Sequence, residues 1–388
     1  MFWLVAAAVI AWSALVAQPW MPWRMRERLE PAVKPGTALT GSAALDDIGV
    51  LIPARNEADA IADALAGVAA QGRFAQVVLV DDQSTDGTAG IARDAAQRLG
   101  LANFEVVNGK APPSGASGKL WALTQGFSRL KTDRVLLLDA DILLAPGMVA
   151  ALETRQRQGN LGLVSLMAHL SMQRPWERVL IPAFIYFFKL LYPFALANRP
   201  GHWMAAAAGG CILTTREALE RIGGFESIQG ALIDDCTLAR RIKRTGFASF
   251  VGVTHGARSA RPYQGLGEIW NMVARTAFTQ LNYSWILLAA CTLLMLLYFV
   301  VPGLGLAVAV FRADAGLAAA ALLALALMVL SYAPTLRFYR LPLWRTLTLP
   351  LAGALYLAMT LSSAWRYAHG VRSTWKARVY DTELNLDR

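Results

Sequence analysis

The sequence predicts an α/β fold, in which a mostly parallel, Rossmann-like sheet domain is joined to α-helical segments that cross a membrane. Short apolar runs alternate with helical patterns between residues 45 and 260, as in a parallel sheet with helical crossovers. Two of these apolar runs end abruptly in paired carboxylates. Long uncharged stretches flank the region, and each is long enough to cross about 30 Å of hydrocarbon.

The composition indicates a membrane protein. The chain has 388 residues, of which 55% are hydrophobic and 16% are charged, too apolar for an ordinary soluble protein. The uncharged stretches are 1–23, 284–311, 315–336 and 346–365. We therefore expect a transmembrane anchor at 1–23, a linker at 24–44, the sheet domain at 45–260, an amphipathic interfacial segment at 261–283, a bundle of about three membrane segments at 284–366, and a basic tail at 367–388.

The N-terminal stretch is interpreted as an uncleaved anchor. It has no basic residue before its apolar core, and Pro19 stands where a cleaved signal peptide would need small residues. Three arginines between residues 24 and 28 follow it, and positive flanks stay on the cytoplasmic side. We expect a multi-pass protein of a bacterial-type inner (cytoplasmic) membrane, with residues 24–283 in the cytoplasm.

The positive-inside rule gives conflicting indications at the C-terminus. Basic residues at 337–345 suit an inside loop, which would put the basic tail outside. The alternative is that residues 346–365, which contain Pro350 and Gly353, form a re-entrant segment.

The net charge of +10 does not indicate nucleic-acid binding, because no basic stretch is interleaved with aromatic residues. Basic residues beside membrane segments are expected to meet anionic lipid headgroups. The cysteines at 211, 236 and 291 lack metal-ligand spacing, so we expect reduced thiols without disulfides.

Within the sheet domain, the patterns predict strands at 48–52, 77–80, 104–107, 135–138, 161–167 and 247–253, and helices at 57–71, 88–99, 118–130, 215–222 and 234–244. The aromatic, apolar stretch 179–198 fits either a buried helix or an interfacial segment. We favour the interfacial interpretation, as for residues 265–283, because rings and a lysine suit the headgroup boundary.

The paired carboxylates predict a nucleotide-sugar site. Asp81 and Asp82 follow one strand, and Asp139 and Asp141 follow another. Ligands of open parallel sheets bind beyond the carboxyl ends of the strands. Two acids separated by one residue project the same way from an extended segment, and can hold a divalent cation against a diphosphate.

Several motifs together resemble family 2 glycosyltransferases of the GT-A fold, over about residues 45–260. They are Ile52-Pro53-Ala54-Arg55-Asn56-Glu57, Asp81-Asp82-Gln83-Ser84-Thr85-Asp86-Gly87-Thr88, Gly118-Lys119, Asp139-Ala140-Asp141, Gly209-Gly210 and Asp234-Asp235. The membrane arrangement and residues 270–281 look like the hopene-associated glycosyltransferases. The resemblance implies a nucleotide-sugar donor, a UDP-sugar, and Mg²⁺ or Mn²⁺.

The resemblance also implies catalytic and metal roles. Asp235 would be the general base that deprotonates the acceptor hydroxyl. Asp234, which would support it, stands where the family usually has Glu, so its side chain is one methylene shorter than in the family pattern. Asp141 would contact the metal directly, with Asp139 nearer the ribose. The alternatives are that Asp234 and Asp235 cap a helix and that Asp139 and Asp141 are turn residues.

The remaining candidates are binding residues. Asp82 and Glu57 can accept hydrogen bonds from the uracil or ribose, unless they cap helices. Lys119 opens a helix, where its charge opposes the macrodipole, so we expect either a diphosphate partner or an exposed loop lysine. The implied binding set is completed by Pro53, Arg55, Asp81 and Arg275. Asp86 is expected to cap the helix that follows it.

Two further residues bear on the acceptor. Arg275 is followed by Thr276, not by the Trp found in many polymer-forming relatives, which disfavours processive synthesis. His255 is either an acceptor-side or metal-side residue, or a structural one. The expected function is transfer of one sugar to a lipid, a hopanoid-type polyterpenoid. The alternatives are a polyprenyl-phosphate, ceramide, carotenoid or exopolysaccharide acceptor, and a membrane scaffold or transport protein with an inactive GT-A domain.

Overall fold

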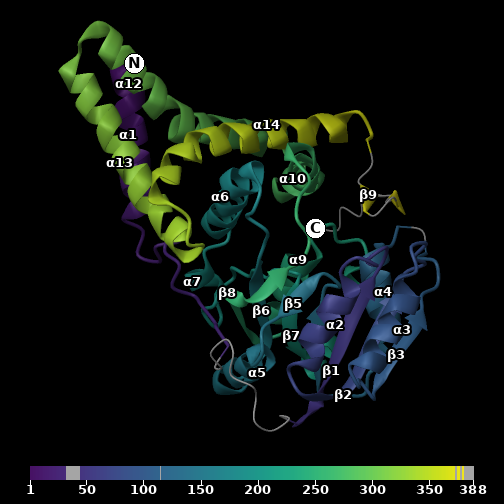
Figure 1. Cartoon of the computed structure of the whole chain (residues 1–388). Coiled ribbons are helices and arrows are strands. Elements are labelled where there is room, and N and C mark those ends of the chain that lie inside the picture. The colour runs from purple at the N-terminus through teal and green to yellow at the C-terminus, as the bar shows by residue number, and fades with distance from the viewer. Residues whose placement is uncertain (32–43, 114, 372–373, 376–377, 380–388) are drawn as a thin grey trace. The chain divides into compact units, whose positions relative to one another are not determined.

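The computed structural model describes residues 1–31, 44–113, 115–371, 374–375 and 378–379 (Figure 1). These residues form two compact units, which are described separately. The helical unit consists of Met1–Arg26, Met172–Ala195 and Tyr263–Val371. The sheet unit is built from Glu27–Ser171 and Leu196–Pro262.

The sheet unit contains an eight-stranded sheet with the order β3-β2-β1-β4-β7-β6-β8-β5. The strands are β1 (Ala44–Ala54), β2 (Arg73–Asp81), β3 (Phe104–Asn108), β4 (Arg134–Leu138), β5 (Ile142–Leu144), β6 (Leu161–His169), β7 (Cys211–Thr215) and β8 (Ala248–Ser259). β1 pairs in parallel with β2 and β4, and β6 with β8. β7 runs antiparallel to both β4 and β6, and β5 runs antiparallel to β8. The sheet is therefore mixed, and the patterns did not predict β5 or β7.

Helices cover both faces of the sheet. One face packs against α2 (Ile61–Ala69), α3 (Thr88–Arg98) and α5 (Met148–Gly159), and the other against α4 (Gly118–Phe127), α8 (Arg216–Arg221), η1 (Phe225–Ile228) and α9 (Asp234–Arg244). Successive side chains of a strand point to opposite faces. Val77 and Leu79 of β2 lie in the first core, and Val78 and Val80 in the second. Burial on both faces explains why these strands read as continuous apolar runs.

Helix α2 lies directly against the backbone of β5. A Cβ atom added at Gly67 would lie 2.8 Å from the main-chain nitrogen of Leu144. The side chain of Gln71 fixes the same junction, because its Nε2 donates to the carbonyls of Gly67 and Ala145.

The helical unit contains the long apolar helices. Its elements are α1 (Phe2–Val16), α6 (Pro175–Leu191), α10 (Leu266–Gln280), α11 (Trp285–Met295), the π-helical turn η2 (Leu296–Val300), α12 (Val301–Arg312), α13 (Ala315–Phe338), η3 (Leu343–Thr348) and α14 (Leu349–Ala368). The short helix α7 (Phe194–Ala197) and the paired strands β9 (Thr374–Trp375) and β10 (Arg378–Val379) complete the described elements.

Within the part of the chain that the structure describes, three helices are long and apolar enough to cross a membrane, namely Trp285–Arg312, Ala315–Phe338 and Leu343–Ala368, with 28, 24 and 26 residues. The N-terminal helix α1 has 15 residues, so it is shorter than the expected span over 1–23. It ends before Pro19, which disfavours helical geometry in the residue that precedes it. α14 continues unbroken through Gly353, because Pro350 occupies its first turn, where proline is tolerated. This continuity does not favour a re-entrant segment.

The two aromatic segments outside the predicted strands contribute helices α6 and α10 to the helical unit. The Tyr186 hydroxyl of α6 lies 2.8 Å from the Ser331 hydroxyl of α13. Tyr356 of α14 donates to the Leu180 carbonyl of α6 over 3.0 Å. Further along α14, Trp270 of α10 donates to Ser362 over 3.1 Å. Side-chain hydrogen bonds therefore tie both helices to the candidate spans.

Candidate functional site

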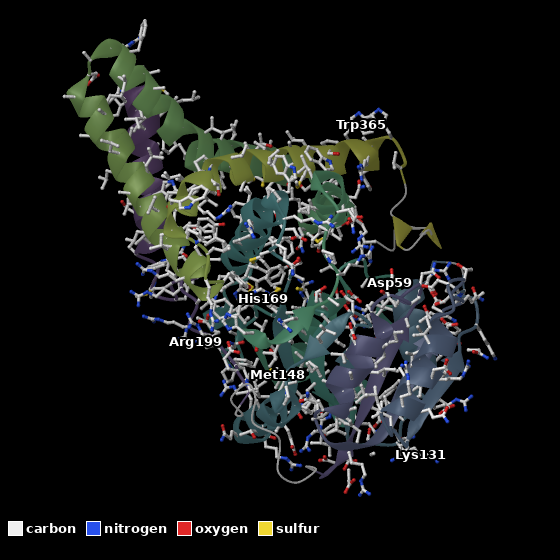
Figure 2. The ribbon with its side chains drawn as sticks, in the orientation of Figure 1. Asp59, Lys131, Met148, His169, Arg199 and Trp365 are labelled. Carbon is white, nitrogen blue, oxygen red and sulfur yellow. The ribbon has the colours of Figure 1, made fainter. Side chains whose placement is uncertain are left out.

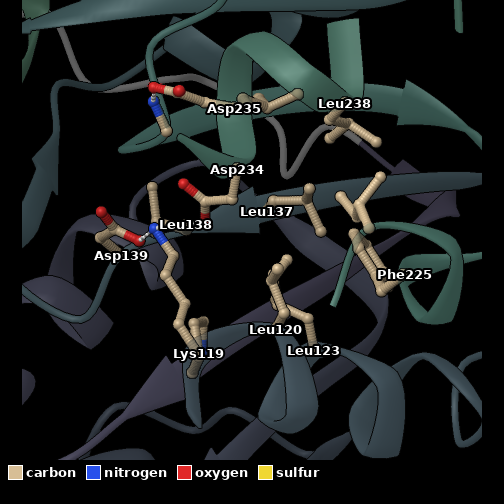
Figure 3. Close-up of a pocket in the computed structure, with 14 residues that line it drawn as sticks. Lys119, Leu120, Leu123, Leu137, Leu138, Asp139, Phe225, Asp234, Asp235 and Leu238 are labelled. Carbon is tan, nitrogen blue, oxygen red and sulfur yellow. Dashed lines mark hydrogen bonds and ion pairs between the residues drawn. The ribbon is translucent and has the colours of Figure 1, made fainter. Parts of the chain in front are cut away.

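The candidate site lies beyond the carboxyl ends of β1 and β4. From β1 the chain moves outward through β2 to β3, and it then returns to the other side of β1 as β4. Ligands of open α/β sheets bind where the strand order reverses in this way. A pocket opens here within the sheet unit (Figure 3). Its polar lining consists of Lys119, Asp139, Asp234 and Asp235. The rest of the lining is Pro53, Leu120, Leu123, Leu137, Leu138, Gly209, Ile212, Phe225, Ile228 and Leu238.

Lys119 joins two of the predicted acidic groups. Its Nζ lies 2.6 Å from Asp139 Oδ1 and 4.0 Å from Asp234 Oδ2. Burial alone would lower the pKa of Lys119, but the charges of Asp139 and Asp234 raise it above the usual value. Lys119 is therefore a cation, and these carboxylates offset the cost of a positive charge in the first turn of α4. Lys119 is the second residue of α4 and its side chain is mostly buried, so it is not an exposed loop lysine.

Asp139 and Asp141 follow β4, separated by Ala140, and they have different partners. Burial raises the pKa of Asp139, the charge on Asp141 adds to this effect, and Lys119 opposes it. Asp141 Oδ2 accepts a hydrogen bond of 2.6 Å from the Ser259 hydroxyl. Among the described residues, no group of three or more His, Cys, Asp or Glu side chains is placed to hold a metal. Two carboxylates fit Mg²⁺ or Mn²⁺, since such ions take few protein ligands and several phosphate or water oxygens.

Asp235 accepts hydrogen bonds from two main-chain N–H groups and has a raised pKa. Its Oδ2 accepts from the Gly209 N–H at 2.9 Å and its Oδ1 from the Cys236 N–H at 2.7 Å. Burial, together with the negative charge of Asp234, raises the pKa of Asp235 to about 7, against the opposing effects of these hydrogen bonds and Lys119. A carboxylate with a pKa near neutrality suits a general base.

Gly209 keeps this part of the site open. A Cβ at this position would lie 3.4 Å from Lys119 Nζ and 3.6 Å from Asp235 Oδ2. The glycine therefore leaves room between the cation and the base. It precedes β7, whose start lies beside the end of β4 because Leu138 pairs with Cys211.

Residues 49–223 match the family model described as glycosyl transferase family 2. They form a family 2 glycosyltransferase domain. The mixed sheet with its flanking helices has the GT-A architecture that the motifs predicted. A solved structure with a similar fold is the mannosyltransferase PcManGT from Pyrobaculum calidifontis, in complex with GDP-Man and Mn²⁺. The TM-score is 0.52 at 21% identity, and the match covers 93% of this chain and 99% of that one.

Relatives with named activities match part of the chain. The undecaprenyl-phosphate 4-deoxy-4-formamido-L-arabinose transferase of Edwardsiella ictaluri is 34% identical over 116 residues, which are 29% of this chain and 34% of that protein. The 4,4'-diaponeurosporenoate glycosyltransferase of Staphylococcus aureus is 26% identical over 245 residues, which are 61% of this chain and 59% of that protein. The chain thus spans about a third to three fifths of the length of these relatives.

The loop after β1 in the glycosyltransferase domain is bonded to the loop after β2. Asn56 has a positive φ of 52°, and its Oδ1 accepts from the Thr85 N–H at 2.9 Å. Asp86 accepts from the N–H groups of Ala58 and Thr88. Thr88 begins α3, so Asp86 satisfies one of the free donors at that helix start, as expected. Burial alone would raise the pKa of Asp86. The hydrogen bonds from Thr88 and Ala58 have the larger combined effect, so the pKa of Asp86 is lowered.

These loop contacts bear on the predicted nucleotide ligands. Arg55 donates to the main-chain carbonyls of Asp82 and Gln83. In this structure it therefore connects the loop after β1 to the loop after β2. The side chain of Asp82 is buried, with a residue exposure of 1%. Asp81 Oδ1 accepts from the Ser84 N–H at 3.3 Å, and the main-chain N–H of Glu57 donates to Thr88. The nucleotide-binding roles of Pro53, Arg55, Glu57, Asp81 and Asp82 stay predictions.

Two other candidates belong to other elements of the structure. Arg275 belongs to α10 of the helical unit, and its diphosphate role stays a prediction. His255 Nδ1 lies 2.7 Å from Glu30 Oε1, and its ring centroid lies 5.8 Å from that of His169, labelled in Figure 2. Glu30 also accepts from the main-chain N–H of His255. These contacts favour the structural interpretation of His255, as part of the junction between β8 and the chain before β1.

Two residues of the site were not assigned a role from the sequence. Ser259 contacts Asp141, and the Gly209 N–H binds Asp235. Gly209 was noted only as a motif residue, and Ser259 had no sequence signal. Both act through contacts with residues more than twenty positions away, which no local pattern displays.

Proposed function

We propose that the protein is a membrane-bound inverting glycosyltransferase, which moves one sugar from a UDP-sugar to the hydroxyl group of a lipid, a hopanoid-type polyterpenoid. The observation that carries this proposal is the half-buried Asp235 carboxyl, which lines the pocket together with Lys119 and Asp234 and has a pKa raised to about 7. The candidate spans of the helical unit support a lipid acceptor. We further propose that the sheet unit lies in the cytoplasm, where nucleotide sugars are made.

In this proposal Asp235 takes the proton of the acceptor hydroxyl while the oxygen of that hydroxyl attacks the anomeric carbon. The bond from that carbon to the diphosphate breaks, and the configuration inverts because one displacement occurs. Lys119 Nζ is paired with Asp139 in this structure. If Asp139 held a cation instead, the Lys119 charge would become available to stabilise the diphosphate. Asp139 and Asp141 would hold that divalent cation, which supplies positive charge to the leaving group.

A polyprenyl-phosphate acceptor is the alternative within the same class. It is favoured by the similarity to the Edwardsiella transferase, whose name specifies undecaprenyl phosphate. An alternative from another class is a scaffold or transport protein with an inactive domain. It fits less well, because buried acids with strongly shifted pKa values concentrate at functional sites.

The test is UDP release by the full-length protein in lipid nanodiscs, with candidate UDP-sugars and either a hopanoid alcohol or a polyprenyl phosphate. Mass spectrometry of the extracted lipids identifies the product. We expect release only with a hydroxyl-bearing polyterpenoid, and its loss in EDTA. Product on the polyprenyl phosphate alone would establish the alternative acceptor, full activity in EDTA would exclude the cation, and no turnover with any pair would favour the inactive scaffold.

A further inference from the structure

One contact in the sheet unit fixes the candidate cation ligand Asp141. Ser259 is the last residue of β8, and its hydroxyl donates to Asp141 Oδ2 over 2.6 Å. The main chain is fixed at the same place, because Ile142 pairs with Ser259 in the antiparallel β5–β8 ladder. The next N–H, that of Ala260, donates to the Asp141 carbonyl over 2.8 Å. Asp141 is thus held through both its backbone and its side chain.

The direction of the Ser259 hydroxyl is determined by its second partner. The N–H of Arg261 donates to Ser259 Oγ over 3.2 Å. A serine hydroxyl has one proton and two lone pairs. Because Arg261 uses a lone pair and an ionised carboxylate can only accept, the single proton of Ser259 goes to Asp141.

The other carboxylate oxygen, Asp141 Oδ1, accepts no hydrogen bond within the described part of the chain. The side chain therefore has one oxygen engaged and one oxygen open. Cations such as Mg²⁺ demand nearly ideal geometry around each ligand oxygen. Hydrogen bonds from outer partners supply that geometry by orienting the ligand.

We propose that Ser259 is a positioning residue, whose hydroxyl holds Asp141 Oδ2 so that Oδ1 is presented to the divalent cation. The proposal rests on the metal-dependent function given above. It assigns Ser259 no contact with substrate. Its effect is on the affinity for the cation.

The test is a Mn²⁺ titration of the full-length protein in nanodiscs with UDP present, with free Mn²⁺ followed by electron paramagnetic resonance. Ser259→Ala should weaken Mn²⁺ binding about 10-fold to 100-fold, the usual effect of losing an outer-shell partner. Ser259→Thr retains the hydroxyl and should restore the affinity. Ser249→Ala removes another hydroxyl from β8, where Ser249 is buried, and should leave Mn²⁺ binding unchanged.

Activity supplies a second measurement. In Ser259→Ala the Mn²⁺ concentration for half-maximal turnover should rise by the same factor, while turnover at saturating Mn²⁺ is retained. Equal Mn²⁺ affinity in Ser259→Ala and the wild type would overturn the role of Ser259 and leave the proposed function standing. Absence of Mn²⁺ binding by the wild-type protein would overturn the metal site itself.

Discussion

At the scale of single residues, the site places the positively charged Lys119 side chain among several carboxyl groups that interact with it. Lys119 contacts Asp139 and approaches Asp234, and Asp235 lies next in sequence. The acids therefore do not have independent affinities for protons. Removal of one group should change the protonation of its neighbours, so neutral replacements of the same shape are the informative ones.

Asp235→Asn keeps the size of the side chain but removes the proton acceptor. Turnover should fall by about 10² to 10⁴, the usual contribution of a positioned base. UDP affinity, measured by calorimetry, should barely change. Asp82→Asn is the matched variant in the predicted nucleotide set, and it should weaken UDP binding more than turnover. Loss of UDP binding in Asp235→Asn with turnover retained at saturating donor would contradict the base assignment.

The pKa of Asp235 predicts a pH dependence of both activity and stability. The base must be ionised, so kcat/KM should rise with pH through about 7 and then level off. The folded pKa lies above the ordinary value of 3.8, so the protonated carboxyl contributes stability that is lost as the pH rises through about 7. The difference in melting temperature, Asp235→Asn minus wild type, should therefore be more positive at pH 8 than at pH 5. A constant difference between the two proteins would argue against the raised pKa.

At the scale of elements, the sheet unit depends on close contact between helices and strands. The Gly67 Cα faces the backbone of Leu144 without any intervening side chain. Gly67→Ala should cost about 1–3 kcal/mol, as overpacking usually does, because backbone cannot rotate away. Gly90 in α3 has open space around it, so Gly90→Ala should stabilise by about 0.5–1 kcal/mol. Urea denaturation of the two variants measures the difference, and similar stabilities would show that α2 can move away from β5.

The sequence predicted most elements because their signals are local. The helix at 234–244 was predicted at its exact bounds, and the three C-terminal spans agree within a few residues. The short strands β5 and β7 were missed for physical reasons. β5 has three residues, too few to show alternation, and β7 is defined by antiparallel pairing with β4 and β6. Asp139 was predicted by its position after a strand, and Asp234 and Asp235 by the resemblance to the family. That Lys119 contacts Asp139 and approaches Asp234 is a tertiary arrangement, which no local pattern shows.

At the scale of the whole molecule, the candidate spans and their flanking charges predict the sides of the membrane. A cysteine at Ser128, exposed at the end of α4, should resist impermeant thiol reagents in intact cells and react in inverted vesicles. Arg312→Cys, at the C-terminal end of α12, should show the opposite pattern. Labelling of Ser128→Cys from outside would exclude a cytoplasmic sheet unit. The same measurement at Ser114 and Ser373, which lie outside the described residues, would extend the map to the loop before α4 and to the tail.

The hydrogen bonds of the helical unit connect parts of the chain that leave the ribosome at very different times. Trp12 of α1 donates to the Tyr298 carbonyl, and the Tyr298 hydroxyl donates to the Ala11 carbonyl, both over 3.1 Å. The Leu180 carbonyl of α6 accepts a hydrogen bond from Tyr356, which is synthesised much later. Every strand of the large sheet has been synthesised by Ser259, before Tyr298 and Tyr356 exist. These contacts of the helical unit therefore form late, α1 with Tyr298 only after η2 has been synthesised and α6 with Tyr356 only after α14 has been synthesised.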